Sequence, residues 1–113
     1  MNQRDELIEI YAEDLKTKCG QEPDMEFLRK VTVALGPSIY NADSSVVSSS
    51  DPSEVATVKN NFLIGKLGLA DGPDLDAGLD AVFETYGRSN RHKYRAVVYY
   101  LLAKHFGKEA IYG

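Results

Sequence analysis

Hydrophobic residues recur along most of the chain at the three- and four-residue spacing of amphipathic helices. The apolar positions of the amino-terminal stretch share one helical face, which predicts a helix from about Gln3 to Lys18. Pro23 suits the first turn of a second helix, where a missing N–H costs nothing. That helix should end at Leu35, because Gly36 favours a left-handed cap and Pro37 cannot continue a helix.

The stretch "GPSIYNADSSVVSSSDPSE" interrupts this rhythm and predicts a structured corner, with Ile39 and Tyr40 turned inward. We expect Asp43 and Asp51 to be N-caps, with a short helical turn at Val46–Val47 between them. "DPSE" at the end of the stretch has the spacing of a capping box, with Pro at the first helical position. A phosphate-binding loop is the functional alternative, but the stretch lacks the Gly spacing and the Lys-Ser/Thr pair of such loops.

Two further helices follow from the same periodicity. The apolar face of the first begins after Asp51, and the helix should end before Gly68. The second ends at Gly87 and carries an acidic stripe at i, i+4 and i+8 on its outer side, formed by Asp76, Asp80 and Glu84.

The last helix should be capped by Ser89 or Asn90 and run to Phe106. Its middle, "AVVYYLLA", is apolar on every side, which is typical of a helix surrounded by others. A buried strand is the competing interpretation, and the absence of an evident partner strand speaks against it. The predicted fold is all-α: a compact irregular bundle of five or six short helices, with the C-terminal helix central, in a single domain over residues 1–113.

Composition indicates the cellular compartment of the protein. A chain of 113 residues can bury a core without disulfides or metals, and the single Cys19 indicates a reducing compartment. The acidic amino terminus does not resemble a secretory signal. The longest apolar run falls far short of the ~20 residues that span a bilayer. We therefore expect a cytoplasmic protein that does not enter the membrane.

Three segments carry a resemblance to a known family: "GPSIYNAD", "KNNFLIGKLGLADGP" and "ETYGRSNRHKYRAVVYYLLAKHFGKE". Together they resemble a family of small bacterial proteins, domain of unknown function 2853, over nearly the whole chain. The resemblance implies a compact single-domain protein of bacterial type. It supplies no activity and no catalytic residues.

No metal, cofactor or catalytic residue is predicted. Asp74, Asp76 and Asp80 have the spacing of part of a calcium loop, but its sixth and twelfth positions would be Leu79 and Thr85, where Gly and Glu are needed. The two histidines would lie about 20 Å apart on one helix, too far to share a metal. Cys19 ends a helix, where the helix dipole disfavours a thiolate.

The carboxyl end is a basic island on a protein of net charge −4. The cluster at the expected start of the last helix gives an anion-binding hypothesis, with these residues as its site: Arg88, Ser89, Asn90, Arg91, Lys93 and Arg95. The favoured interpretation is internal, with the acidic stripe of Asp76, Asp80 and Glu84 neutralising the cluster across a helix hairpin.

For function, we predict a non-enzymatic protein-interaction or structural module, with an unknown protein partner or a second copy of itself in a homodimer. Anion or nucleic-acid binding through the basic cluster is the alternative. Nucleic acid is disfavoured because the acidic protein would repel a polyanion at long range. A small enzyme is the remote third hypothesis.

Overall fold

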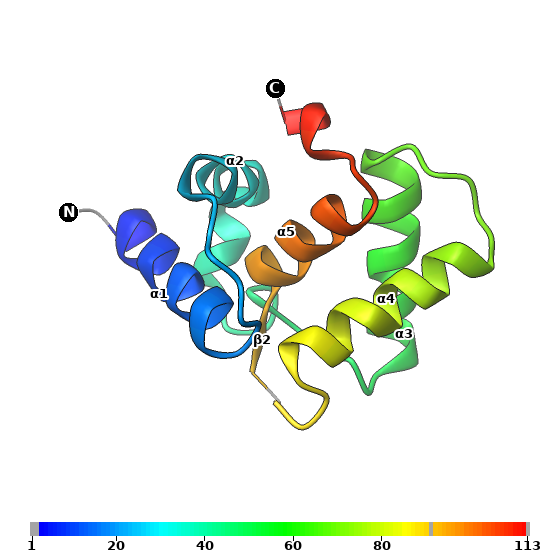
Figure 1. Ribbon diagram of the computed structural model, residues 1–113, viewed down its shortest axis with the longest axis horizontal. Helices are drawn as coiled ribbons and strands as arrows, with labels where there is room; N and C mark the ends of the chain where they lie inside the picture. The colour runs from blue at the N-terminus through cyan, green and yellow to red at the C-terminus, as the bar shows by residue number, and fades with distance from the viewer. Residues whose placement is uncertain (1–2, 91, 113) are drawn as a thin grey trace.

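The computed structural model describes residues 3–90 and 92–112. It confirms a mostly helical bundle, with one very short pair of strands (Figure 1). The α-helices of these residues are α1 (Gln3–Thr17), α2 (Met25–Leu35), α3 (Pro52–Thr57), α4 (Pro73–Tyr86) and α5 (Arg95–His105). α3 continues into a π-helical segment, Val58–Lys66. Short 3-10 helices form at Gly36–Tyr40 and Glu109–Tyr112.

α5 occupies the centre of the bundle, as predicted. It packs against α1 and α2 on one side and α4 on the other (Figure 1). Most of its residues are buried: Ala96, Val97, Val98, Tyr100, Leu101, Leu102 and Ala103. The hydroxyl of Tyr100 also accepts a hydrogen bond from the amide of Asp24, 2.9 Å away, which ties α5 to the start of α2.

The helix starts are set by side-chain caps, with two corrections to the prediction. Asp24 caps α2 by accepting from the amide of Phe27, so Pro23 lies before the cap and not in the first turn. Asp51 caps α3 as expected, accepting from the amide of Ser53 at 3.0 Å. Glu54 does not complete a capping box, because its carboxylate pairs with Arg95 instead.

The predicted helical turn at Val46–Val47 is wrong. These residues form strand β1, which pairs antiparallel with strand β2 (Lys93–Tyr94), Val46 opposite Tyr94. Asp43 is not a cap either, since its amide donates to the side chain of Asn41 in a turn. The pairing holds this part of the chain extended because both strands gain backbone hydrogen bonds that a single helical turn would lack.

The last helix also begins later than predicted, at Arg95, with Tyr94 at its cap position. The backbone amides at this point are used outside the helix: that of Tyr94 donates to the Tyr86 hydroxyl, and that of Arg95 donates to the Ser45 carbonyl. Ser89 and Asn90 therefore belong to a turn between α4 and β2.

The corner after α2 agrees with the prediction at Gly36 and Ile39 but not at Tyr40. Gly36 has the predicted positive φ, 64°, and Ile39 is buried. Tyr40 was expected inside, but its side chain is exposed. A 3-10 helix turns by about 120° per residue, so two neighbouring side chains cannot both face the core.

Candidate functional site

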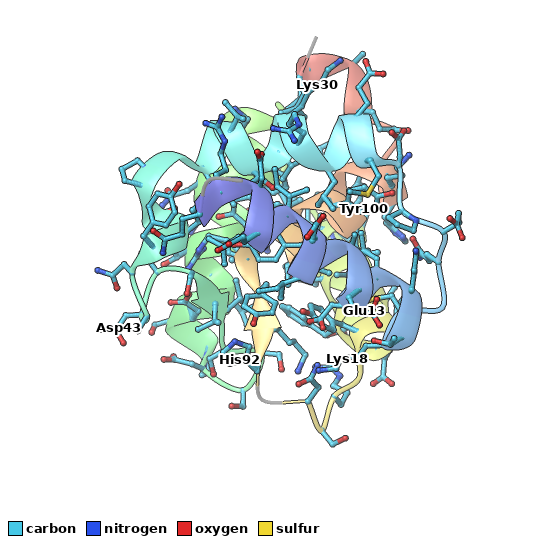
Figure 2. All side chains as sticks on the ribbon, turned by 90° about the vertical axis from the view of Figure 1, so that its left-hand side faces the viewer. Glu13, Lys18, Lys30, Asp43, His92 and Tyr100 are labelled. Atoms are coloured by element: carbon cyan, nitrogen blue, oxygen red, sulfur yellow. The ribbon has the colours of Figure 1, made fainter. Side chains whose placement is uncertain are left out.

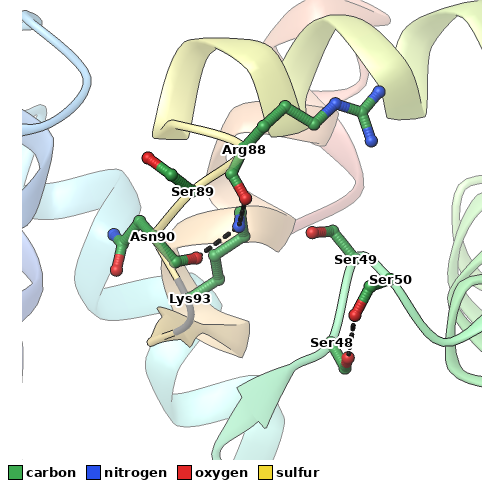
Figure 3. Close-up of a pocket in the computed structure, with 7 residues that line it drawn as sticks. All are labelled: Ser48, Ser49, Ser50, Arg88, Ser89, Asn90 and Lys93. Carbon is green, nitrogen blue, oxygen red and sulfur yellow. Dashed lines mark hydrogen bonds between the residues drawn. The ribbon is translucent and has the colours of Figure 1, made fainter.

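The residues of the anion-binding hypothesis do not form one cluster. Three of them, Arg88, Ser89 and Asn90, form the turn after α4 and border a pocket of about 520 Å³ together with Lys93 of β2. The opposite wall is the segment Ser48–Ser50, which links β1 to α3 (Figure 3). Arg91 lies outside the described residues.

Lys93 is the buried charge of this pocket, with only 2% of its surface exposed. Its Nζ donates to the backbone carbonyl of Asn90 and, at 3.5 Å, to that of Arg88 (Figure 3). Within the part of the chain that the structure describes, no carboxylate forms an ion pair with it. Burial lowers the pKa of Lys93, and the positive charge of Arg88 lowers it further.

Arg88 turns the other way. Its guanidinium points away from Lys93 in Figure 3 and pairs with Glu84 at 2.9 Å and with Asp80 at 3.0 Å. The internal interpretation of the basic cluster is therefore confirmed for this residue. It does not extend to Asp76, which pairs with Lys59 at 3.2 Å.

Arg95 is part of the framework of the fold. Its guanidinium donates to the carbonyls of Ser44 (2.7 Å) and Val46 (3.3 Å) and to the hydroxyl of Tyr99 (3.1 Å). It also pairs with the Glu54 carboxylate at 2.6 Å. The side chain of Arg95 joins three segments and does not line the pocket.

The other candidate groups have ordinary structural positions. The pKa of Cys19 is raised to about 11, first by burial and then by the nearby charge of Asp14, which leaves the thiol protonated and poorly reactive. Asp74 and Asp76 lie in the first turn of α4, where acidic residues complement the helix dipole.

A second surface stands out on the outer side of α2. We call it the α2 face: two hollows, of about 260 Å³ and about 480 Å³, that share Val33 as a lining residue. One lies toward Tyr40, and the other lies toward Ile111 in the C-terminal 3-10 helix. Val33 and Tyr40 are each 48% exposed and Ile111 is 40% exposed, so three large apolar side chains meet solvent here.

Cations border the α2 face, and no acidic residue lines either hollow among the described residues. The cations are Arg4, Arg29, Lys30 and Lys66. Figure 2 looks onto α1 and α2 and shows Lys30 beside the C-terminal segment. The buried Nε of Arg4 has no hydrogen-bond partner among the described residues.

Comparison with known protein families shows to which family the chain belongs. The model of the family "Protein of unknown function (DUF2853)" matches residues 10–110. The chain belongs to this family. A search of curated proteins finds no match. In residues 3–90 and 92–112 no helix combines the length and apolar character needed to cross a bilayer.

Sequence reasoning missed the serine wall of the pocket and the α2 face. "SSS" at 48–50 looks like ordinary loop sequence, and only the β1–β2 pairing brings it opposite Lys93. Val33 lies on the outer side of α2, and the exposure of Ile111 beside it depends on how the C-terminal segment folds back over that helix.

Proposed function

We propose that this protein is a non-enzymatic protein-interaction module of the cytoplasm, and that the α2 face is its docking surface. The partner is a protein segment that carries apolar side chains and acidic residues. The observation that supports this is the pairing of exposed apolar side chains with a border of cations, on a chain whose net charge is −4.

Both parts of this surface favour such a partner. Contiguous exposed apolar side chains are typical of interaction sites on small soluble domains, because burying them against a partner removes them from water. Arg29 already pairs with Asp5 at 3.0 Å and Lys30 with Glu26 at 3.6 Å, whereas Arg4 and Lys66 form no ion pair among the described residues and would attract carboxylates of the partner. Arg4 is available for this, since no ion pair or hydrogen bond among the described residues engages its guanidinium.

The charge pattern also argues against symmetric self-association through this face. Two copies related by a twofold axis would bring the same cations together, and like charges across an interface oppose binding. A homodimer would have to use a different surface, so an acidic partner fits the α2 face better than a second copy does.

The test is affinity capture from host lysate, followed by identification of the contact segment by crosslinking. Val33→Glu places a carboxylate among the apolar side chains and should reduce capture of the partner about tenfold or more. Ile10→Glu is the matched control, because Ile10 is also exposed (43%) but lies on α1 and lines neither hollow. Capture that is equal for both variants, or a contact segment without acidic residues, would contradict the proposal.

A further inference from the structure

We propose that the pocket between Ser48–Ser50 and the turn Arg88–Asn90 binds a small phosphate monoester, with Lys93 as the positive charge that holds it. This site is independent of the proposed function, since its lining residues and those of the α2 face do not overlap.

The first argument is the charge of Lys93. A lysine with 2% exposure is normally paired with a carboxylate, because an isolated buried charge is costly. Here the two carbonyl acceptors orient the ammonium group but bring no net negative charge. An ammonium group has three donors, so one N–H remains for a ligand.

The lowered pKa of Lys93 agrees with this argument. Burial and the charge of Arg88 both disfavour the protonated form. Arg88 pairs with Asp80 and Glu84, which lie on α4 and form no ion pair with Lys93 among the described residues. A bound anion would offset the cost of the buried charge.

The second argument is the opposite wall. Ser48 and Ser50 are hydrogen-bonded to each other at 3.4 Å, whereas no hydrogen bond among the described residues engages the Ser49 hydroxyl. In Figure 3 that hydroxyl points across the pocket toward Lys93. A tetrahedral phosphate has oxygens in several directions and can accept from the ammonium group on one side and from the hydroxyl on the other.

Pocket size and net charge restrict the ligand class. About 520 Å³ lies within the usual ~300–1,000 Å³ of small-molecule sites and exceeds what one phosphate ion fills. A nucleic acid is disfavoured because the protein as a whole is acidic. A phosphate group on a small organic body fits both constraints.

The test is a thermal melt with inorganic phosphate and with phenyl phosphate, each against chloride at matched ionic strength. Binding to the folded state should raise Tm with the logarithm of the ligand excess over Kd. Phenyl phosphate should bind more tightly than inorganic phosphate, because the pocket has room for its ring. Lys93→Gln should weaken both affinities about tenfold or more. Lys104→Gln should leave both affinities unchanged, since this substitution removes the same charge but at the far end of α5 from the pocket.

A second variant keeps the test decisive if Lys93→Gln does not fold. Ser49→Ala changes only a hydroxyl in the loop and should weaken phenyl phosphate binding about threefold or more. Ser45→Ala is its control, because Ser45 does not line the pocket. Equal melts in phosphate and chloride, or an unchanged response in Ser49→Ala, would overturn the proposal. Tighter binding of a short RNA than of phenyl phosphate would overturn the ligand class.

Discussion

Lys93 and Arg95 are two residues apart, Lys93 in β2 and Arg95 at the start of the central helix α5, and both are largely removed from water, with 2% of Lys93 and 14% of the Arg95 side chain exposed. The two side chains differ in whether a carboxylate balances their charge. Arg95 has a carboxylate partner and three neutral acceptors from the loop before β1, β1 itself and α5. Lys93 has two backbone carbonyls and, among the described residues, no carboxylate.

The difference separates a charge used for folding from a charge that folding leaves unbalanced. Arg95 satisfies carbonyls that no ladder of two-residue strands could satisfy, so its burial is compensated inside the molecule. Lys93 is held in place without being neutralised. Neighbouring basic residues in one sequence cluster therefore have different roles, and the four variants below test that separation.

Arg95→Met should have the largest effect. It leaves Glu54 without its partner and two backbone carbonyls without their donor, so we expect a loss of about 3 kcal/mol in the free energy of unfolding. A urea melt measures it. Arg95→Lys should recover only part of the loss, because an ammonium group cannot reach all these acceptors at once. A loss below about 1 kcal/mol for Arg95→Met would remove the contrast with Lys93.

Tyr86→Phe tests the residue between the two, Tyr94, whose amide donates to the Tyr86 hydroxyl at 3.1 Å. That hydroxyl donates in turn to the buried carboxylate of Asp14 at 2.5 Å. Removing it leaves the Tyr94 amide without its acceptor and leaves Asp14 with only its ion pair to Lys18, 3.8 Å away, so the free energy of unfolding in a urea melt should fall by about 1–2 kcal/mol. Tyr99→Phe removes only one of the several acceptors of Arg95 and should lower the free energy of unfolding by less. Equal losses would show that the Tyr86 hydroxyl has no special role in holding β2.

The sequence was sufficient where the signals are local. Asp51 before "PSE" and the Gly36-Pro37 pair mark helix ends through their own backbone neighbours, and the structure agrees with both. The periodicity of "AVVYYLLA" likewise indicated a surrounded helix.

The sequence was insufficient to predict the structure where segments distant along the chain contact each other. The strand at Val46–Val47 exists because Lys93–Tyr94 pairs with it, and neither dipeptide is a strand signal alone. The late start of α5 depends on acceptors from Ser45 and Tyr86, which no local pattern reveals. For the same reason the basic cluster could be found in the sequence but not divided into Arg88, Lys93 and Arg95 with their separate partners.

Lys93→Met should shift stability in the opposite direction from Arg95→Met. Replacing an unbalanced buried charge by an apolar side chain should leave stability at neutral pH unchanged or raise it by up to about 1 kcal/mol. The folded-state pKa of Lys93 lies below its ordinary 10.5, so the unfolded state binds more protons between these two values and the wild type gains stability as pH rises. The advantage of the variant should therefore shrink as the pH rises from neutral toward 10.

The pH range of that comparison stops below the titration of tyrosines. Tyr11 has a pKa raised to about 12 by burial, so it favours unfolding as pH rises above its ordinary 10.0. Urea melts of both proteins at several pH values measure the difference. A large loss in Lys93→Met at every pH would mean that Lys93 is a framework residue like Arg95.

The smallest effect is expected for the double variant Asp80→Asn with Glu84→Gln, which removes both partners of Arg88. These groups are exposed, so Tm should fall only slightly, and the fall should disappear at about 1 M salt, where exposed charges are screened. Freeing Arg88 adds positive potential at the rim of the pocket and should strengthen phenyl phosphate binding at low salt. Asp76→Asn is the control, because Asp76 pairs with Lys59 and should not change that binding. Weaker phosphate binding in the double variant would mean that the acidic stripe, and not Lys93, organises this side of the molecule.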